Sequence, residues 1–153
     1  MDEPQLTQKE DFSMFKHILV PTDLTQKSEK AMDIAIKFAS FDELNKITLL
    51  HVIETIEDAD DKEFKEFYKK LKDRAEAEMG KMVSRYMKKE IAFDTKILFG
   101  NRVREIVRFA HENNAELIIL SSHRIEETDV AQGWATISYR VGILADCPVM
   151  MVK

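Results

Sequence analysis

Short apolar runs alternate with amphipathic stretches along most of the chain, and this alternation limits the fold more than any other feature. The runs cover residues 17–20, 46–53, 91–99, 117–120 and 147–152. Runs of this kind, rich in β-branched residues, are typical of strands that are buried on both faces. Parallel strands need long crossovers, which helices supply. The sequence therefore predicts the order β-α-β-α-β-α-β-α-β and a single doubly wound, five-stranded parallel sheet with helices on both faces.

The amphipathic stretches between these runs predict the helices. The first carries apolar residues on one helical face, from Ala31 to Phe38. The second covers residues 64–89, the third follows the capping residue Asn101, and the last covers residues 136–145. From this register we expect a core that includes Phe38, Leu50, Ile106, Ile119 and Val149.

The first residues of the chain differ from the rest. Residues 1–14 are polar, contain Pro4 and show no periodicity, so we expect a flexible leader followed by one domain over residues 15–153. The leader lacks the basic and apolar regions of a signal peptide. No apolar run approaches the ~20 residues of a membrane span. We therefore expect a cytoplasmic protein without a membrane partner.

Charge and cysteine content exclude two classes of function. The formal net charge is −5, whereas proteins that coat nucleic acid need clustered Lys and Arg to neutralise phosphate. A nucleic-acid partner is therefore not expected. The single cysteine, Cys147, excludes an internal disulfide and a CxxC metal or redox site. We expect Cys147 to serve as a small buried residue.

Polar side chains follow the predicted strands at their carboxyl ends. Ligands bind beyond these ends in open parallel sheets, near the point where the strand order reverses. The rule selects three groups of residues that are distant in sequence: Pro21, Thr22 and Asp23; His51 and Val52; and Ser121, Ser122 and His123. We expect these groups to meet along one edge of the sheet.

Three kinds of site compete for these residues. Asp23, His51 and His123 have the chemistry of a metal or acid–base site. Ser121 or Ser122 would be a nucleophile, but the G-x-S-x-G turn that exposes such a serine is missing. A nucleotide site would place Asp23 near the base or ribose, with phosphate at the backbone amides of a helix start. Polar strand ends are common in parallel sheets, so the first two alternatives rank below the third.

Four segments of the sequence favour the nucleotide site: Lys16–Asp23, Leu49–Ile53, Ala115–His123 and Cys147–Val149. In this order and spacing they resemble the universal stress protein family over about residues 15–153. The resemblance implies a Rossmann-like fold of the adenine nucleotide alpha hydrolase-like type. It also implies an ATP site, because many members bind ATP through the pattern G-x-x-G, nine residues, then G-S or G-T.

This chain departs from that glycine pattern. Ser121 and Arg124 stand at the first two glycine positions, and Ala135 and Thr136 stand at the last pair, with one additional residue in between. Glycines let backbone amides approach phosphates closely. The segment 125–129 is acidic where a triphosphate would lie, and like charges oppose binding. Arg124 can pair with a phosphate or with a neighbouring glutamate, and we favour the glutamate.

The resemblance divides the site into two sides. The nucleoside side consists of Pro21, Thr22, Asp23 and Val52, which all fit the family; the phosphate side consists of Ser121, Ser122, Arg124, Ala135 and Thr136. The residues of the nucleoside side match the pattern of the family, whereas those of the phosphate side differ from its glycine pattern. An alternative role for Asp23 is to cap the first helix, which does not exclude a ligand contact.

We therefore expect a small dimeric stress-response or regulatory protein with weak or no ATP binding and no catalytic activity. The alternative is an adenine-nucleotide protein that binds ATP or AMP, with slow or no hydrolysis. A metal-dependent hydrolase ranks third. The last strand, residues 148–152, is an apolar edge that we expect to pair with the same strand of a second subunit. A regulatory role also implies a protein partner, which the sequence does not identify.

Overall fold

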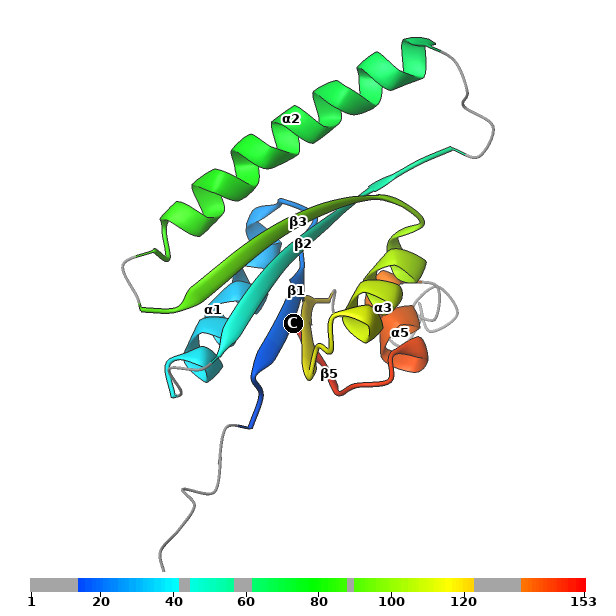
Figure 1. Cartoon of the computed structure of the whole chain (residues 1–153). Helices are drawn as coiled ribbons and strands as arrows, with labels where there is room; N and C mark the ends of the chain where they lie inside the picture. Colours follow the sequence, from blue (N-terminus) through cyan, green and yellow to red (C-terminus); the bar gives the residue numbers. More distant parts are fainter. Residues whose placement is uncertain (1–13, 42–44, 57–61, 88–89, 123–135) are drawn as a thin grey trace, which may run out of the picture.

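The computed structural model describes residues 14–41, 45–56, 62–87, 90–122 and 136–153 (Figure 1). The elements are, in chain order, β1 (His17–Pro21), the 3-10 turn η1 (Gln26–Ser28), α1 (Glu29–Ala39), β2 (Lys46–Glu54), α2 (Lys62–Ser84), β3 (Ala92–Gly100), α3 (Arg102–Glu112), β4 (Leu117–Ser121), α5 (Ile137–Leu144) and β5 (Val149–Val152). The predicted strands are all present, and so is the predicted alternation with helices.

The strands form one five-stranded sheet in the order β3-β2-β1-β4-β5. Every neighbouring pair is parallel. The chain first moves outward from β1 to β3 and then crosses to the other side of β1 to form β4. The strand order therefore reverses between β1 and β4, which confirms the predicted doubly wound sheet.

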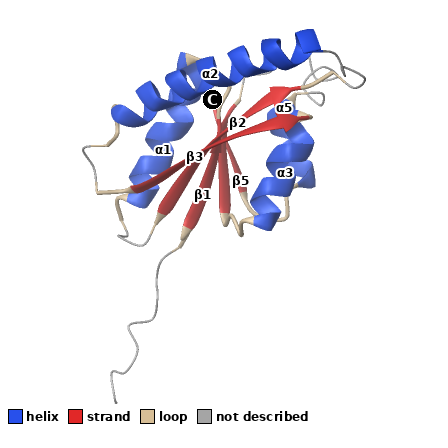
Figure 2. Cartoon of the chain, turned by 45° about the horizontal axis from the view of Figure 1, so that its top comes forward, coloured by secondary structure: helices blue, strands red, loops and turns tan. Residues whose placement is uncertain are grey.

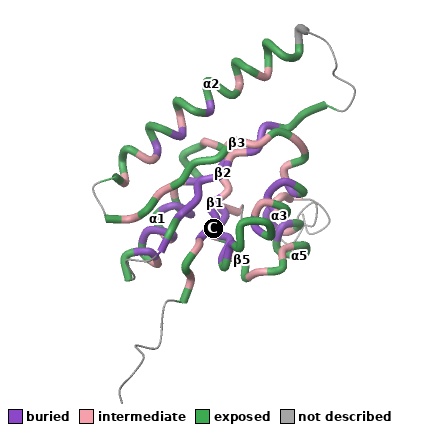
Figure 3. The backbone as a smooth tube through the Cα atoms, viewed as in Figure 1, coloured by how far each residue is buried: buried purple, intermediate pink, exposed green. Residues whose placement is uncertain are grey.

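Helices cover both faces of the sheet (Figure 2). Alternate residues of a strand point to opposite faces, and this alternation divides the core into two clusters. Ile18 and Val20 of β1 pack in the cluster beneath α1 and α2, whereas Leu19 packs in the cluster beneath α3 and α5. Buried residues gather at β1, β2 and α1, while much of α2 is exposed (Figure 3).

The predicted core residues are confirmed in three of five cases. Leu50, Ile106 and Ile119 are at most 4% exposed. Phe38 and Val149 are half-buried and pack against the two clusters from their margins. Phe38 lies at the end of α1 with its ring edge-on to Phe15, and Val149 lies on the edge strand β5.

Other local predictions also have outcomes. Asn101 caps α3, since its side-chain oxygen accepts a hydrogen bond from the backbone N–H of Arg104 at 3.0 Å. Cys147 is half-buried against the second cluster, and burial raises the pKa of its thiol. The predicted leader lies outside the described residues except for Met14, which is exposed. Within the described ranges no helix has the length and apolar character needed to cross a membrane.

Replacing Ile119 with Ala should destabilise the protein by about 2–5 kcal/mol, because the side chain is fully buried beside the central strand and its loss leaves a cavity. The chemically matched control is Ile143→Ala on α5, where the side chain is 62% exposed and the expected cost is under about 0.5 kcal/mol. Urea unfolding of both variants measures the difference. Equal costs would contradict the register of β4.

Candidate functional site

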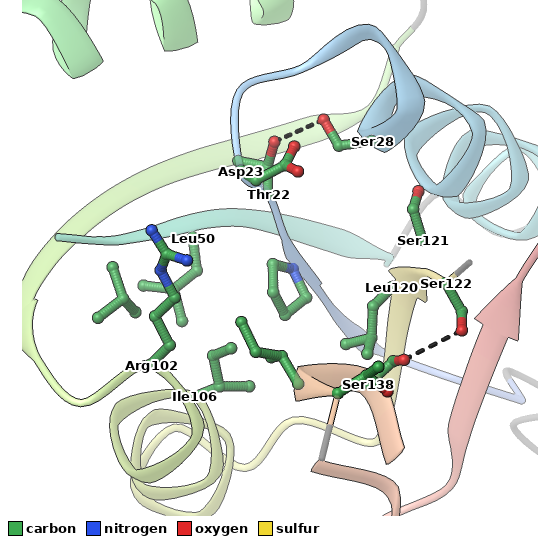
Figure 4. A pocket seen from close by; sticks show the side chains of 14 residues that line it. Thr22, Asp23, Ser28, Leu50, Arg102, Ile106, Leu120, Ser121, Ser122 and Ser138 are labelled. Atoms are coloured by element: carbon green, nitrogen blue, oxygen red, sulfur yellow. Dashed lines mark hydrogen bonds between the residues drawn. The ribbon is translucent and has the colours of Figure 1, made fainter. Parts of the chain in front are cut away.

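A pocket with a volume of about 400 Å³ lies at the carboxyl ends of the strands (Figure 4). Pockets of about 300–1,000 Å³ are typical of sites for small molecules. The loops after β1 and β4, the end of β2 and the starts of α3 and α5 form its walls. The lining residues are Pro21, Thr22, Asp23, Ser28, Leu50, Val52, Arg102, Ile106, Leu120, Ser121, Ser122, Thr136, Ile137 and Ser138.

Most of the predicted site residues line this one pocket. They are Pro21, Thr22, Asp23 and Val52 of the nucleoside side, and Ser121, Ser122 and Thr136 of the phosphate side. Arg124, Ala135 and the acidic segment 125–129 lie outside the described residues. The fold therefore brings together three distant parts of the sequence as expected. Their role in ligand binding stays a prediction.

Pro21 explains why the pocket opens between β1 and β4. The backbone N–H of Thr22 bonds to the carbonyl of Leu50 on β2 at 2.8 Å, so the preceding residue directs its backbone nitrogen toward β4. That residue is Pro21, which has no N–H to donate. The register of β1 with β4 accordingly ends at the pair of Leu19 and Ile118, although β1 stays paired with β2 through Pro21.

The loop after β1 is held by its own hydroxyl groups. The hydroxyl oxygen of Thr22 accepts from the backbone N–H of Leu24 at 3.0 Å, and its proton goes to the hydroxyl of Ser28 at 2.8 Å. Ser28 in turn donates to the carbonyl of Thr25 at 2.6 Å. Leu24 has a φ of 66°, a left-handed conformation that costs a non-glycine residue about 1–2 kcal/mol. These bonds fix the loop in that conformation.

Asp23 closes a turn and does not cap α1. Its Oδ1 accepts from the backbone N–H of Thr25 at 2.9 Å and from the Thr25 hydroxyl at 2.6 Å. The turn η1 separates Asp23 from α1, which begins at Glu29, so the carboxylate is displaced from the first turn of that helix. The helix-cap hypothesis is therefore wrong. Both bonds engage Oδ1, so Oδ2 keeps its capacity to accept from a ligand hydroxyl or amine.

The serines on the other side of the pocket are also held by the fold. Ser121 donates from its hydroxyl to the carbonyl of Lys27 at 2.7 Å. Ser138, which is buried at the start of α5, donates to the hydroxyl oxygen of Ser122 at 3.0 Å (Figure 4). A nucleophilic serine needs a base that takes its proton. Ser121 instead gives its proton to a backbone carbonyl, which does not support the nucleophile hypothesis.

His51 links the ends of two strands. Its Nδ1 lies 2.8 Å from the carbonyl oxygen of Thr22. A carbonyl only accepts, so Nδ1 carries the proton and donates it. Among the described residues no group of three His, Cys, Asp or Glu side chains is placed to hold a metal ion. His123, the third member of the proposed metal or acid–base site, lies outside the described residues.

Arg102 lines the pocket but was not predicted from the sequence. It is the first residue of α3, and its Nε lies 4.0 Å from Oε1 of Glu54 at the end of β2. Gly100, with a φ of 143°, makes the turn from β3 into α3 that places Arg102 there. The prediction considered the ends of three strands and the positions assigned by resemblance, and Arg102 belongs to neither set. Its position directly after a strand-ending glycine and a helix cap was the available signal.

Comparisons with known proteins agree on one family. The model of the universal stress protein family matches residues 14–153. The solved structure of the hypothetical protein MJ0577 is 26% identical, with a TM-score of 0.77, and the match covers 92% of this chain and 96% of that chain. The universal stress protein UspA from Lactobacillus plantarum is 20% identical, with a TM-score of 0.75 and coverage of 90% and 97%. A search of curated proteins gives no match.

One further solved structure was determined with a nucleotide. It is a universal stress protein family member from Arabidopsis thaliana with AMP bound. It is 18% identical to this chain, with a TM-score of 0.65, and the match covers 90% of each chain. At this level of identity the likeness shows the fold alone.

Replacing Asp23 with Ala should abolish binding of any adenosine-type ligand, because the exposed carboxylate is the acidic group of the predicted nucleoside side. The fold should survive, since the lost turn bonds contribute only about 1 kcal/mol. Asp23→Asn keeps an oxygen for the turn and removes the charge, and Asp73→Ala on α2 is a control away from the pocket. Calorimetric titration with adenosine measures the effect. Unchanged affinity in folded Asp23→Ala would refute the assignment.

Proposed function

Because the chain belongs to the universal stress protein family, we propose that it is a regulatory protein whose pocket binds an adenine nucleoside or nucleoside monophosphate and binds ATP only weakly. One observation carries the proposal. The four residues of the nucleoside side come from β1, the loop that follows it and β2, and they line a single pocket at the switch point of the sheet. That position is the usual ligand site of a doubly wound fold.

The nucleoside side has the chemistry of such a ligand. Val52, Leu50 and Ile106 supply an apolar wall for a flat base. Asp23 supplies an acceptor for a sugar hydroxyl or a base amine. Two relatives of the same fold support a ligand with one phosphate. One was solved in complex with cAMP and another with AMP bound, and each of these nucleotides has a single phosphate.

The phosphate side is poorly suited to a triphosphate. Ser121 stands where the family has its first phosphate-binding glycine, and its hydroxyl is bonded to the Lys27 carbonyl. The segment 125–129 adds carboxylates to this side of the sequence. Each further phosphate of a ligand would add charge of the same sign, which opposes binding. Regulation by a ligand or a protein partner is therefore favoured over ATP hydrolysis.

The second candidate is a protein that binds ATP as well as AMP and hydrolyses ATP slowly or not at all. Thr136, which corresponds to the last position of the glycine pattern, lines the pocket at the start of α5 and favours this candidate. Against it stands the loss of every glycine in that pattern. We propose the cytoplasm as the compartment in either case, because the chain has only one cysteine and needs no oxidising environment.

We further propose that the protein forms a homodimer through β5. This strand pairs with β4 on one side and is at the edge of the sheet on the other. Met151 is 36% exposed, and the neighbouring residues of the strand are half-buried. An apolar edge strand is prone to association unless it is paired. Antiparallel pairing of two β5 strands across a two-fold axis would close this edge in both subunits.

Calorimetric titrations with adenosine, AMP and ATP test the ligand. We expect the first two to bind more tightly than ATP, and Mg²⁺ not to rescue ATP binding. Replacing Glu126 and Glu127 with Gln should raise the affinity for ATP and leave that for adenosine unchanged, because the family resemblance aligns this segment with the phosphate-binding part of the sequence. A low-micromolar ATP site in the wild-type protein would overturn weak ATP binding and favour the second candidate.

A proline on β5 tests the dimer. The carbonyls of Pro148 and Val152 face β4, so the backbone N–H of Met151 points to the free edge. Met151→Pro removes this N–H and leaves the bonds to β4 in place, whereas Met151→Leu keeps it. Sedimentation should show the wild type and Met151→Leu as dimers and Met151→Pro shifted toward monomer.

Deletion of residues 1–14 distinguishes the leader from a second subunit as the cover of this edge. We expect the shortened protein to stay dimeric. A wild type that is monomeric at micromolar concentration, or a Met151→Pro variant that dimerises normally, would show that the proposed interface is wrong.

A further inference from the structure

Arg102 is the only basic side chain among the described residues that line the pocket. It is partly exposed, and it lines the same pocket as the apolar residues Leu50 and Ile106 (Figure 4). A guanidinium has five N–H donors and no acceptor. It would therefore contact an acceptor or an anion of whatever ligand fills the pocket.

The fold places Arg102 on the side of the pocket away from the serines. It follows β3 directly, and Gly100 at the end of β3 is in register with Glu54 at the end of β2. Ser121 ends β4, which lies two strands from β2, a separation of about 9–10 Å at the usual strand spacing. Arg102 thus lies at the end of β2, the strand that carries Val52 of the nucleoside side, and the serines of the phosphate side are across the pocket.

Glu54 is the acidic neighbour of Arg102. It follows Val52 by two residues on the same strand, so its side chain continues the face of β2 that lines the pocket. Its Oε1 lies 4.0 Å from the Nε of Arg102. The pair presents a set of donors next to a set of acceptors. Because the carboxylate offsets the positive charge, the pair is better suited to hydrogen bonding with a polar edge than to attracting an anion.

We propose that Arg102 is a specificity-determining residue that donates hydrogen bonds to the ring nitrogens on the edge of the bound adenine, with Glu54 holding its guanidinium in position. This inference rests on the proposed function, since it concerns the same pocket. Adenine has ring-nitrogen acceptors beside an amino donor, which matches the adjacent donors of Arg102 and acceptors of Glu54. The edge of the base then faces Arg102, its flat face lies on the apolar wall, and the sugar lies near Asp23.

Titration of Arg102→Ala with adenosine, AMP and ATP tests this role. A contact to the base should weaken all three ligands by the same factor, about tenfold, because all three share the base. Arg104→Ala is the matched control: it removes the same charge from the same helix at an exposed position that does not line the pocket. Arg102→Lys should not restore affinity, because an ammonium lacks the planar fork of donors.

Ligand analogues locate the contact on the base. The analogues 1-deazaadenosine and 7-deazaadenosine each lack one ring acceptor. We expect one of them to bind the wild type more weakly than adenosine does. The same analogue should bind Arg102→Ala as well as adenosine does. Glu54→Gln should give a smaller loss of adenosine affinity than Arg102→Ala. Circular dichroism establishes that each variant is folded, which is expected for changes at partly exposed positions.

The outcomes separate this inference from the proposed function. If the wild type binds neither adenosine nor AMP, the proposed function fails and this inference fails with it. If the wild type binds adenosine and Arg102→Ala binds it equally well, only the inference is overturned. A loss that grows from adenosine to ATP would show that Arg102 contacts phosphate, and it would overturn the assignment to the base.

Discussion

The candidate site depends on the place where β1 stops pairing with β4. β1 also pairs with β2, and β4 also pairs with β5. Pro21 removes the N–H that would extend the ladder, and the two backbones separate beyond Leu19 and Ile118. The same residue stays paired with β2, which holds the following loop at the other wall of the opening. One missing donor in the central strand thus produces a pocket at the switch point.

The loop after Pro21 converts this opening into a site with defined polar groups. Thr22 is buried and uses its hydroxyl as both donor and acceptor, and His51 binds its backbone carbonyl from β2. These bonds offset the cost of the left-handed backbone at Leu24. The result is that Asp23 lies exposed at the mouth of the pocket, with one carboxylate oxygen already engaged by Thr25. A side chain held in this way loses little conformational freedom when a ligand binds.

The strands and the nucleoside side could be predicted from the sequence because both depend on local patterns. The apolar runs of β1, β2 and β4 are too short and too β-branched for helices, and a parallel sheet brings their carboxyl ends together whatever the details of the loops. The role of Asp23 could not be predicted in the same way. The groups that hydrogen-bond to its carboxylate depend on whether α1 starts immediately after the loop or after the additional turn η1. Hydrophobic periodicity does not determine the start of a helix to within one turn.

Arg102 shows a second limit of prediction from the sequence. A charged residue at the start of a helix is ordinarily solvent-exposed, and the glycine and helix cap that precede Arg102 place it at the end of a strand without showing that it lines a pocket. Its position in the site depends on the pairing of Gly100 with Glu54 across two strands, which is a property of the sheet register. Phe38 and Val149 are the converse case, since both were predicted to be buried and both are only half-buried in the structure. Their apolar character is evident in the sequence, but their place at the margin of the core is set by the tertiary structure.

The pocket and the edge strand are connected through one residue, Ser122. Ser122 lines the pocket. Its backbone N–H donates to the carbonyl of Val152, the last residue of β5, at 2.8 Å. Its hydroxyl accepts from Ser138 at the start of α5. A ligand group that contacts Ser122 would therefore act on the end of the edge strand and on the helix beside it through one residue. Ligand binding and pairing at β5 would then share a free energy of coupling, and each would strengthen or weaken the other by the same factor.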